Sequence, residues 1–457
     1  MAAIITDPFK KQMVQTIFDE VGAGNHRYYI GIGRSEQWDD SENVPTVTDT
    51  PRTLRNLRAG LQSIKSASDV SFTIPRYNWT SGTIYSAYDD DFASIPATNS
   101  YYVLTEDNQV YICLQQGRSS TGASVTSTVK PTGTSAKAFK TADGYVWKFL
   151  YTLSATNANK FLSSNFVPVE KVLDSATLGR SLTVLEEQQV VVQDAAVPGQ
   201  IIGVAVTNGG TGYTSAPAVT INGDGVRAAA TATVSGGTIT KIELDSSADS
   251  GITMGQGYNF ASISFSGGGG SNATARAILG PDSGMGNDPR DELKSTSLMF
   301  NTKPNGIEDS NFIVGQDFRQ VALIRDPKDN SDADFTTSSG KVLRFLKLQA
   351  LANVGFLDAT ITGATSGAQA LVDEVDSDRL YFHQTEDTGF LAFQEGETIT
   401  GGGQTGILAA EGDDVDSDAF TNDDVNKLSG QILYIENRAP VTRSANQTED
   451  IKVVITL

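Results

Sequence analysis

The stretch GQILYIENRAP, residues 430–440, decides how the fold of this chain is interpreted. Its first half alternates polar with large apolar side chains and is rich in isoleucine and tyrosine, which is typical of a β-strand. Three polar residues, Glu436, Asn437 and Arg438, end the apolar run. Pro440 then predicts the end of strand pairing, because proline has no backbone N–H to donate. We expect these polar side chains to fix the geometry of a loop, with direct contact to a partner as the alternative.

Similar strand-like sequence runs occur along most of the chain. Short runs rich in β-branched and aromatic residues, each bounded by turn formers, predict further strands. They occupy residues 28–32, 70–74, 101–104, 110–114, 145–153, 183–192, 318–324, 342–348 and 451–457.

Two helices are predicted near the N-terminus. Asp7 and Pro8 suit the start of the first helix, and the second opens at Thr50 and Pro51. Apolar residues then recur at helical spacing; they are Phe9, Met13, Ile17 and Val21 in the first helix and Leu54, Leu57, Leu61 and Ile64 in the second. A short helical turn is expected near residues 157–161.

Two glycine-rich segments interrupt the strand pattern. In the first, GTGY at residues 210–213 returns as GQGY at residues 255–258, and each copy is followed by similar short strands. Tandem β units of this kind stack to form a small core. We therefore expect two small all-β insertions, at residues 198–284 and 351–414. The scaffold around them comprises residues 1–197, 285–350 and 415–457.

Composition limits the classes of function. The formal net charge of −20 disfavours binding to nucleic acid, because phosphates carry the same sign. Cys113 is the only cysteine, so the chain holds no internal disulfide. The first residues lack the basic flank and apolar run of a signal peptide, and no apolar stretch approaches the length of a membrane span. We expect a chain that folds in the cytoplasm and binds no membrane.

No catalytic residue, cofactor or metal site is predicted. The chain has only two histidines, His26 and His383, and both are expected at the surface or in an interface. Cys113 lies between apolar neighbours and is expected to be buried. The glycines at residues 267–270 are expected to form a turn. Alternating carboxylates at residues 414–418 resemble the start of a calcium loop but lack its later ligands, so a solvated turn is expected, with weak cation binding as the alternative.

Acidic pairs raise a hydrolase alternative. Glu386 with Asp387, or Glu395 with Glu397, would supply the two carboxyl groups of a glycosidase if they faced each other across a cleft. Nothing in the sequence places them so, and we expect a protein without enzymatic activity.

Six sequence blocks outside the insertions resemble the baseplate wedge subunit of T4-type contractile-tailed phages. The blocks occur in the same order as in that family. The block at residues 430–440 is the most specific of the six. The others lie at residues 32–38, 74–79, 111–114, 143–150 and 318–320. The blocks cover both ends of the chain, and the two glycine-rich segments have no counterpart in the family pattern.

The blocks supply the candidate structural or interface residues. Arg34 is expected to clamp a carboxylate, Glu36 to accept backbone N–H groups, and the three tryptophans to anchor loops onto the core or to form interface hot spots. The full set is Arg34, Glu36, Trp38, Arg76, Trp79, Trp147, Arg319, Glu436, Asn437 and Arg438.

The resemblance implies a mainly β (α+β) fold, with a β-sandwich-like scaffold, a few N-terminal helices and the two insertions. It implies one continuous β framework that forms a homodimer, contacts other baseplate wedge proteins and resides in the tail baseplate of the virion after assembly in the host cytoplasm. The alternative is a binding module whose insertions recognise host-surface glycans. In that case the stacking residues would be Tyr213, Tyr258, Tyr381, Phe390 and Phe393.

Overall fold

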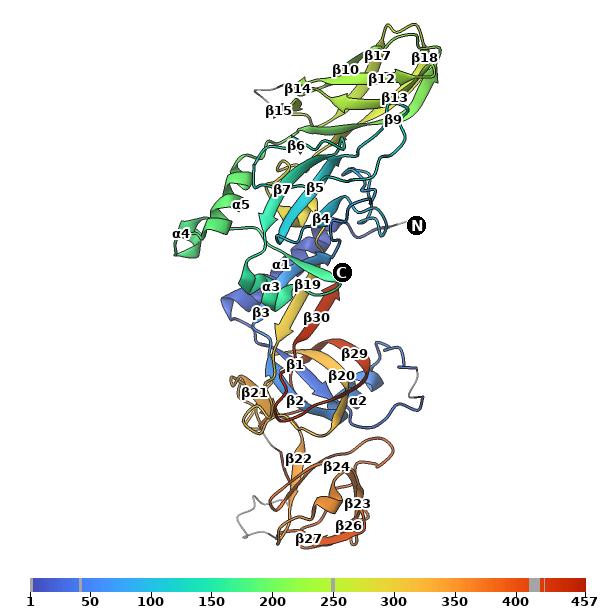
Figure 1. Cartoon of the computed structure of the whole chain (residues 1–457). Helices are drawn as coiled ribbons and strands as arrows, with labels where there is room; N and C mark the ends of the chain where they lie inside the picture. Colours follow the sequence, from blue (N-terminus) through green and yellow to red (C-terminus); the bar gives the residue numbers. More distant parts are fainter. Residues whose placement is uncertain (1–2, 41–42, 248–250, 411–419, 423) are drawn as a thin grey trace. The chain divides into compact units, whose positions relative to one another are not determined.

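The computed structural model describes residues 3–40, 43–247, 251–410, 420–422 and 424–457. The chain forms two compact units. Unit 1 comprises Met1–Val14, Ser71–Leu298 and Thr456–Leu457, and unit 2 comprises Gln15–Val70 and Met299–Ile455. Strands hold 40% of the residues and helices 13%, so the fold is mainly β with some helix, as the sequence predicted (Figure 1).

The helices begin where the sequence offers caps. Thr50 accepts a hydrogen bond from the N–H of Thr53 at the start of α2, and Thr183 forms a capping box with Glu186 at the start of α5. The helices of the described chain are α1 (Asp7–Ala23), α2 (Pro51–Gly60), α3 (Ala155–Phe161), α4 (Ser175–Leu178), α5 (Val184–Asp194) and α6 (Pro289–Glu292).

Two predicted elements are wrong. Leu61 and Ile64 do not continue the second helix, because α2 ends at Gly60 and the next residues form strand β2 (Leu61–Ser66), which pairs with β1 (Tyr28–Gly33). Residues 183–192 form α5 instead of a strand. The capping box starts this helix, and tertiary packing of Gln189 and Val192 outweighs the β propensity of its valines.

Unit 1 is built on a four-stranded sheet of order β4-β5-β7-β6. Its strands are β4 (Tyr102–Leu104), β5 (Gln109–Gln115), β6 (Phe139–Lys140) and β7 (Val146–Thr152). A second pairing joins β3 (Asp69–Pro75) to β8 (Phe166–Val169). Trp147 is fully buried in this sheet and stacks on Tyr145, with ring centroids 5.7 Å apart.

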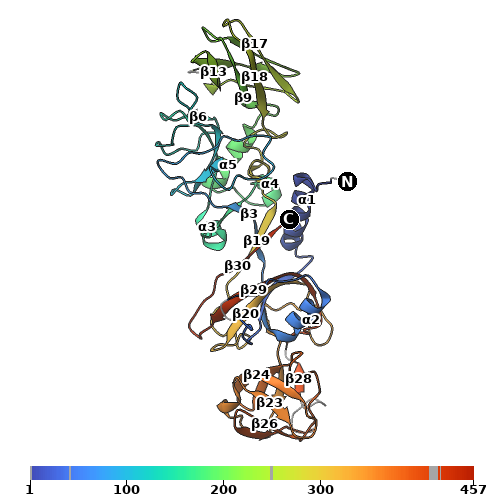
Figure 2. The ribbon, with the colours of Figure 1, turned by 90° about the vertical axis from the view of Figure 1, so that its right-hand side faces the viewer.

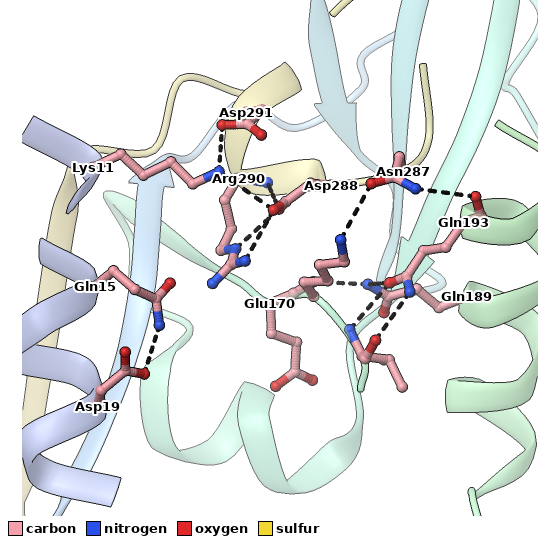
Figure 3. Close-up of polar contacts among 12 residues, drawn as sticks. Lys11, Gln15, Asp19, Glu170, Gln189, Gln193, Asn287, Asp288, Arg290 and Asp291 are labelled. Carbon is pink, nitrogen blue, oxygen red and sulfur yellow. Dashed lines mark hydrogen bonds and ion pairs between the residues drawn. The ribbon is translucent and has the colours of Figure 1, made fainter. Parts of the chain in front are cut away.

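Helix α5 is tied to unit 1 by glutamine side chains that bond backbone groups (Figure 3). Gln193 accepts a hydrogen bond from the N–H of Val172 (3.1 Å) and donates one to its carbonyl (3.0 Å). Gln189 donates to the carbonyl of Glu170 at 2.7 Å. The helix therefore satisfies backbone groups of the segment after β8, as a neighbouring strand would.

The glycine-rich residues 201–279 form strands that, within the described chain, pair only with one another. The pairings give a four-stranded sheet β13-β12-β10-β17 and the pairs β18-β9, β11-β16 and β14-β15. The strands are β9 (Ile201–Thr211), β10 (Ala218–Gly223), β11 (Val226–Ala228), β12 (Ala230–Ser235), β13 (Thr238–Leu244), β14 (Ser246–Ser247), β15 (Gly251–Ile252), β16 (Met254–Gln256), β17 (Ala261–Ser266) and β18 (Ser271–Leu279). Side chains from β9 and from the four-stranded sheet share one core, so this module is sandwich-like.

The repeat has a packing reason. Tyr213 and Tyr258, one in each copy, are both buried. A Cβ at Gly270 would lie 2.4 Å from the ring of Tyr213, and a Cβ at Gly225 would lie 2.4 Å from the ring of Tyr258. Each core tyrosine thus packs against a glycine of the other copy, which makes room for its ring, and residues 267–270 form the expected turn region.

We expect Gly225→Ala to lower the free energy of unfolding of this module by about 1–3 kcal/mol, because the added methyl group overpacks the ring of Tyr258. Gly22→Ala is the control of the same chemical change, since nothing lies within 4 Å of the Cβ position there. Hydrogen exchange of peptides from residues 201–279 measures the effect. Equal protection in both variants would contradict it.

Unit 2 contains two larger sheets, of order β21-β2-β1-β20-β29 and β27-β26-β23-β24-β25-β22-β28. The first sheet adds β20 (Asp317–Arg325), β21 (Ser339–Lys341) and β29 (Gln431–Thr442) to the strands already named, and β19 (Ser297–Thr302) lies beside β30 (Ile451–Thr456). The second comprises β22 (Arg344–Lys347), β23 (Thr360–Gly363), β24 (Gln369–Asp376), β25 (Arg379–His383), β26 (Thr398–Gly401), β27 (Gln404–Ile407) and β28 (Phe420–Asn422), with the short helix η1 (Val354–Phe356) beside it. Strands β22 and β28 lie outside the expected insertion at residues 351–414.

Pro440 does not end strand pairing, which corrects the sequence prediction. It lies within β29, the last strand of its sheet, between residues that pair with Gln320 and Phe318 at a β-bulge. An edge strand at a bulge tolerates proline because no neighbour needs its missing N–H.

Candidate interaction site

Three of the six sequence blocks meet at one end of the five-stranded sheet of unit 2. Gly33 at the end of β1 lies opposite Gln320 of β20, and Gln320 lies opposite Asn437 of β29. The amide of Gln320 also donates to the side chain of Asn437 at 2.8 Å. The register of three neighbouring strands therefore brings together residues that are about 400 positions apart in sequence.

The loop after β1, residues 34–38, is held in place from two sides. Arg319 of β20 is 5% exposed and donates to the carbonyl of Ser35, and its other terminal nitrogen lies 2.8 Å from Asp317. The indole N–H of Trp38 donates to the carbonyl of Arg438 on β29 at 2.9 Å. Trp38 thus anchors its loop onto a strand, as expected.

Arg34 does not clamp a carboxylate, in contrast to the prediction. Its backbone has a positive φ of 61°, its N–H donates to the carbonyl of Gly60, and its guanidinium lies 4.2 Å above the ring of Trp38. The cation–π contact helps to fix the tryptophan over β29. The carboxylate of Glu36 accepts a hydrogen bond from its own backbone N–H, in line with the prediction, and also has an imidazole as its charged partner.

That imidazole belongs to His383, which is fully buried between two carboxylates. Its Nδ1 lies 2.5 Å from Asp373 Oδ2, and its Nε2 lies 3.1 Å from Glu36 Oε1. Ser35 Oγ donates to the other oxygen of Asp373 at 2.7 Å. The interpretation of His383 as a surface or interface residue is wrong, because β25 buries all of its residues except the first.

The electrostatics of this group follow from its partners. Burial alone would lower the pKa of His383, but Asp373 and Glu36 raise that pKa to about 10. Burial would raise the pKa of Glu36, yet the hydrogen bond and charge of His383 hold it below its usual value. The imidazole is therefore a cation at neutral pH, and it links strands β24 and β25 to the loop after β1.

A polar hollow of about 390 Å³ lies beside the loop. Its lining includes Ser35, Glu36, Asp317, Arg319 and Asp358. Together with the half-exposed side chains of Glu436 and Arg438, which lie 3.7 Å apart, it gives this end of the sheet a charged surface.

The remaining candidate residues lie in unit 1. Arg76 donates to Asn78 (2.9 Å) and to the carbonyl of Ser163 (2.8 Å), which fixes a turn. Trp79 donates to Ser127 at 3.1 Å, and Trp147 is a core residue of β7. Cys113 pairs with Trp147 across β5 and β7 and is buried, as predicted; burial raises the pKa of its thiol.

The six blocks therefore do not form one continuous framework. Three of them, at residues 32–38, 318–320 and 430–440, belong to unit 2. The other three belong to unit 1, where residues 111–114 and 143–150 lie on the paired strands β5 and β7. Within each unit the blocks are joined by sheet pairing or by backbone hydrogen bonds. In unit 1, the N–H of Trp79 donates to the carbonyl of Leu104 on β4.

The arrangement lacks the parts of a nucleophilic active site. Ser35 is oriented toward Asp373, whereas a nucleophilic serine would bond an imidazole nitrogen. Both nitrogens of His383 face carboxylates, which leaves neither for a metal ion. Among the described residues, no group of three or more His, Cys, Asp or Glu side chains is placed to hold a metal. Residues 414–418, the calcium-like stretch, lie outside the described part of the chain.

Two of the four carboxylates of the hydrolase alternative have structural contacts. Glu386 pairs with Arg52, and Glu397 accepts hydrogen bonds from the N–H groups of Thr365, Ser366 and Gln394. Of the aromatic residues in the glycan alternative, Tyr213, Tyr258, Tyr381 and Phe393 are buried, and Phe390 is exposed.

We expect Arg319→Lys to destabilise unit 2 by about 1–3 kcal/mol, because an ammonium group cannot bond both the carbonyl of Ser35 and Asp317 in the same fork geometry. Arg438→Lys is the matched control, since its side chain is 39% exposed. Denaturant unfolding followed by hydrogen exchange in residues 28–38 compares them. Equal loss in the two variants would contradict the role given to Arg319.

The sequence signal for the buried histidine was present but incomplete. Asp373 interrupts the apolar run of β24, and such a carboxylate requires a buried partner.

No described helix combines the length and the apolar character that crossing a bilayer requires. No protein-family model matches the chain, and no curated protein matches it either.

Proposed function

We propose that this chain is a structural subunit of the baseplate wedge in a contractile phage tail, without enzymatic activity. It works as a homodimer, contacts other wedge proteins and participates in baseplate assembly and in the rearrangement that accompanies infection. The six sequence blocks that resemble the T4-type wedge subunit are the basis of the proposal.

One structural observation supports it most. The polar residues of three blocks are brought into register at one end of a single sheet, and they are used to hold a loop and to border a charged hollow. The described contacts at this convergence are backbone hydrogen bonds, the cation–π contact of Arg34 with Trp38, and paired charges. That construction suits a rigid surface for protein contacts.

The glycan alternative has less support, because four of its five aromatic residues fill cores and do not present a ring face to solvent. Stacking on sugars needs exposed aromatic faces, and only Phe390 of the five offers one.

Gold-labelled antibodies against the purified chain, applied to washed particles of the virus that encodes it, test the location. We expect label at the end of the tail that is distal to the capsid. Antibody preabsorbed with the purified chain is the control. Label on the capsid or along the sheath, or washed particles without label, would overturn the proposal.

A further inference from the structure

In the first two turns of helix α1, charged side chains pair with unit 1 while two large apolar side chains face solvent. Lys11 lies 3.3 Å from Asp288 and also contacts Asp291 at helix α6, as Figure 3 shows. Asp7 pairs with Lys294 at 3.4 Å. Within unit 1 the inward side of α1 is therefore held largely by ion pairs.

The outward side of the same helix carries large apolar groups. Phe9 and Met13, four residues apart on the helix, are 56% and 46% exposed, and Ile4 and Ile5 just before the helix are 87% and 59% exposed. In contrast, Val14 on the inward side is 2% exposed. We call Ile4, Ile5, Phe9 and Met13 the α1 stripe. Figure 2 shows α1 in dark blue, next to the label of the N-terminus.

The exposed side of these two turns thus differs from that of an ordinary surface helix, whose charges face water. A contiguous apolar stripe in contact with water is unfavourable and commonly marks an interaction site. Thr6 and Gln12 are exposed beside the stripe, and Lys10, three residues before Met13, is the charged residue nearest to it. The stripe itself is suited to another apolar surface.

The area of the stripe matches what a dimer requires. Four side chains of this size offer roughly 100 Å² each, so two copies together bury about 800 Å² of apolar surface. Apolar atoms make up about 57% of a standard interface, so this core corresponds to a total of about 1,400 Å². That total lies within the range of stable protein–protein interfaces, about 1,200–2,000 Å².

We propose that the α1 stripe is the dimer interface of this protein, and that its occupant is the α1 stripe of a second copy, related by a two-fold axis close to Phe9. A two-fold interface brings the same patch of both copies together, and an uncharged apolar stripe is complementary to itself. The ion pairs of Lys11 and Asp7 involve residues 288–294, so the proposed contact does not have to break them. This inference rests on the homodimer of the proposed function and assigns it a surface.

Sedimentation velocity of the full-length chain over a range of concentrations tests the interface. We expect the wild type to form a dimer, and a Phe9→Ser, Met13→Gln variant to raise the dimer dissociation constant about 100-fold or more. Both positions are half-exposed, so the fold is expected to persist. The matched control is Val184→Ser, Val191→Gln, which replaces two apolar residues of α5 that are 68% and 59% exposed. The control should remain a dimer.

A cross-linking experiment tests the same geometry without weakening the interface. The only native cysteine, Cys113, is buried, so a short bis-maleimide reagent has no exposed target in the wild type. Phe9→Cys should yield a covalent dimer, and Val191→Cys on α5 should not. A monomeric wild type, a double variant that dimerises normally, or Phe9→Cys without cross-linking would each overturn the inference.

The outcomes separate this inference from the proposed function. If antibodies label the tail end and the Phe9→Ser, Met13→Gln variant still forms a dimer, the proposed function stands and only the interface is refuted. A dimer that depends on α1, in a protein absent from the virion, would refute the function and leave the interface standing. A monomer that associates with phosphatidylcholine vesicles through the stripe would replace the second copy by a lipid surface and would also overturn the inference.

Discussion

His383→Leu is expected to lower the free energy of unfolding of unit 2 by about 3–5 kcal/mol. The imidazole is fully buried and lies between Asp373 and Glu36. Leucine fills a similar volume but leaves Asp373, which is 1% exposed, without its cationic partner. The cost therefore arises from an uncompensated buried charge and not from a cavity.

Hydrogen exchange of peptides from residues 369–383 and 28–38 measures this loss in the intact chain. His26→Leu is the control for the only other histidine, whose side chain is 35% exposed and bonds Asp326 at 2.6 Å. We expect that change to cost no more than about 1 kcal/mol. If the two variants lose equal protection, His383 does not carry the role assigned to it.

A second substitution separates charge from shape. Adding Asp373→Leu to His383→Leu removes the orphaned carboxylate, and we expect the double variant to regain at least half of the protection lost by the single variant. Glu36 is 22% exposed, so its carboxylate can turn to water. A double variant less stable than the single one would indicate that packing, not charge, holds this group together.

The positions of many strands could be predicted because they depend on short, local runs of sequence. β5, β7, β20 and β30 are runs of β-branched and aromatic residues bounded by turns, and each lies where the pattern predicted it. Residues 61–66 and 183–192 were assigned wrongly because short apolar runs satisfy both periodicities. Residues 61–66 form a strand because they pair with β1. Residues 183–192 form a helix because the capping box of Thr183 and Glu186 stabilises its first turn.

The sequence predicted some residues of the candidate site but not their contacts, for a different reason. Arg319, Trp38 and Asn437 could be named because they lie in blocks with a family resemblance. Their bonds depend on strand register, which the sequence does not specify for residues hundreds of positions apart. His383 was misplaced because its two partners come from a distant loop and a neighbouring strand, and only tertiary structure brings a buried histidine to two carboxylates.

The stability of unit 2 is expected to fall as the pH rises from about 6.5 toward about 10. Burial would lower the pKa of His383, but Asp373 and Glu36 raise it from 6.5 to about 10. The unfolded chain releases this proton near pH 6.5, so the folded chain holds one more proton throughout that window. The contribution is complete below pH 6.5 and is lost progressively as the pH rises to about 10.

Lys427 opposes this trend in the upper half of the window. Burial, followed by the charge of Arg344, lowers its pKa from 10.5 to about 8. Between about pH 8 and 10.5 the unfolded chain therefore binds the additional proton, and this group favours the folded state as the pH rises. In the wild type we expect a fall in stability from pH 6.5 to 8 and little change from pH 8 to 10.

Two variants separate the two titrations. In Lys427→Met the fall should continue to pH 10, because only the histidine still titrates, whereas in His383→Leu the fall between pH 6.5 and 8 should disappear. Denaturant midpoints at each pH unit, read from exchange in residues 369–383, supply the comparison. If the wild type and His383→Leu share one slope between pH 6.5 and 8, the imidazole between Asp373 and Glu36 is not the charged link that joins the loop after β1 to the seven-stranded sheet.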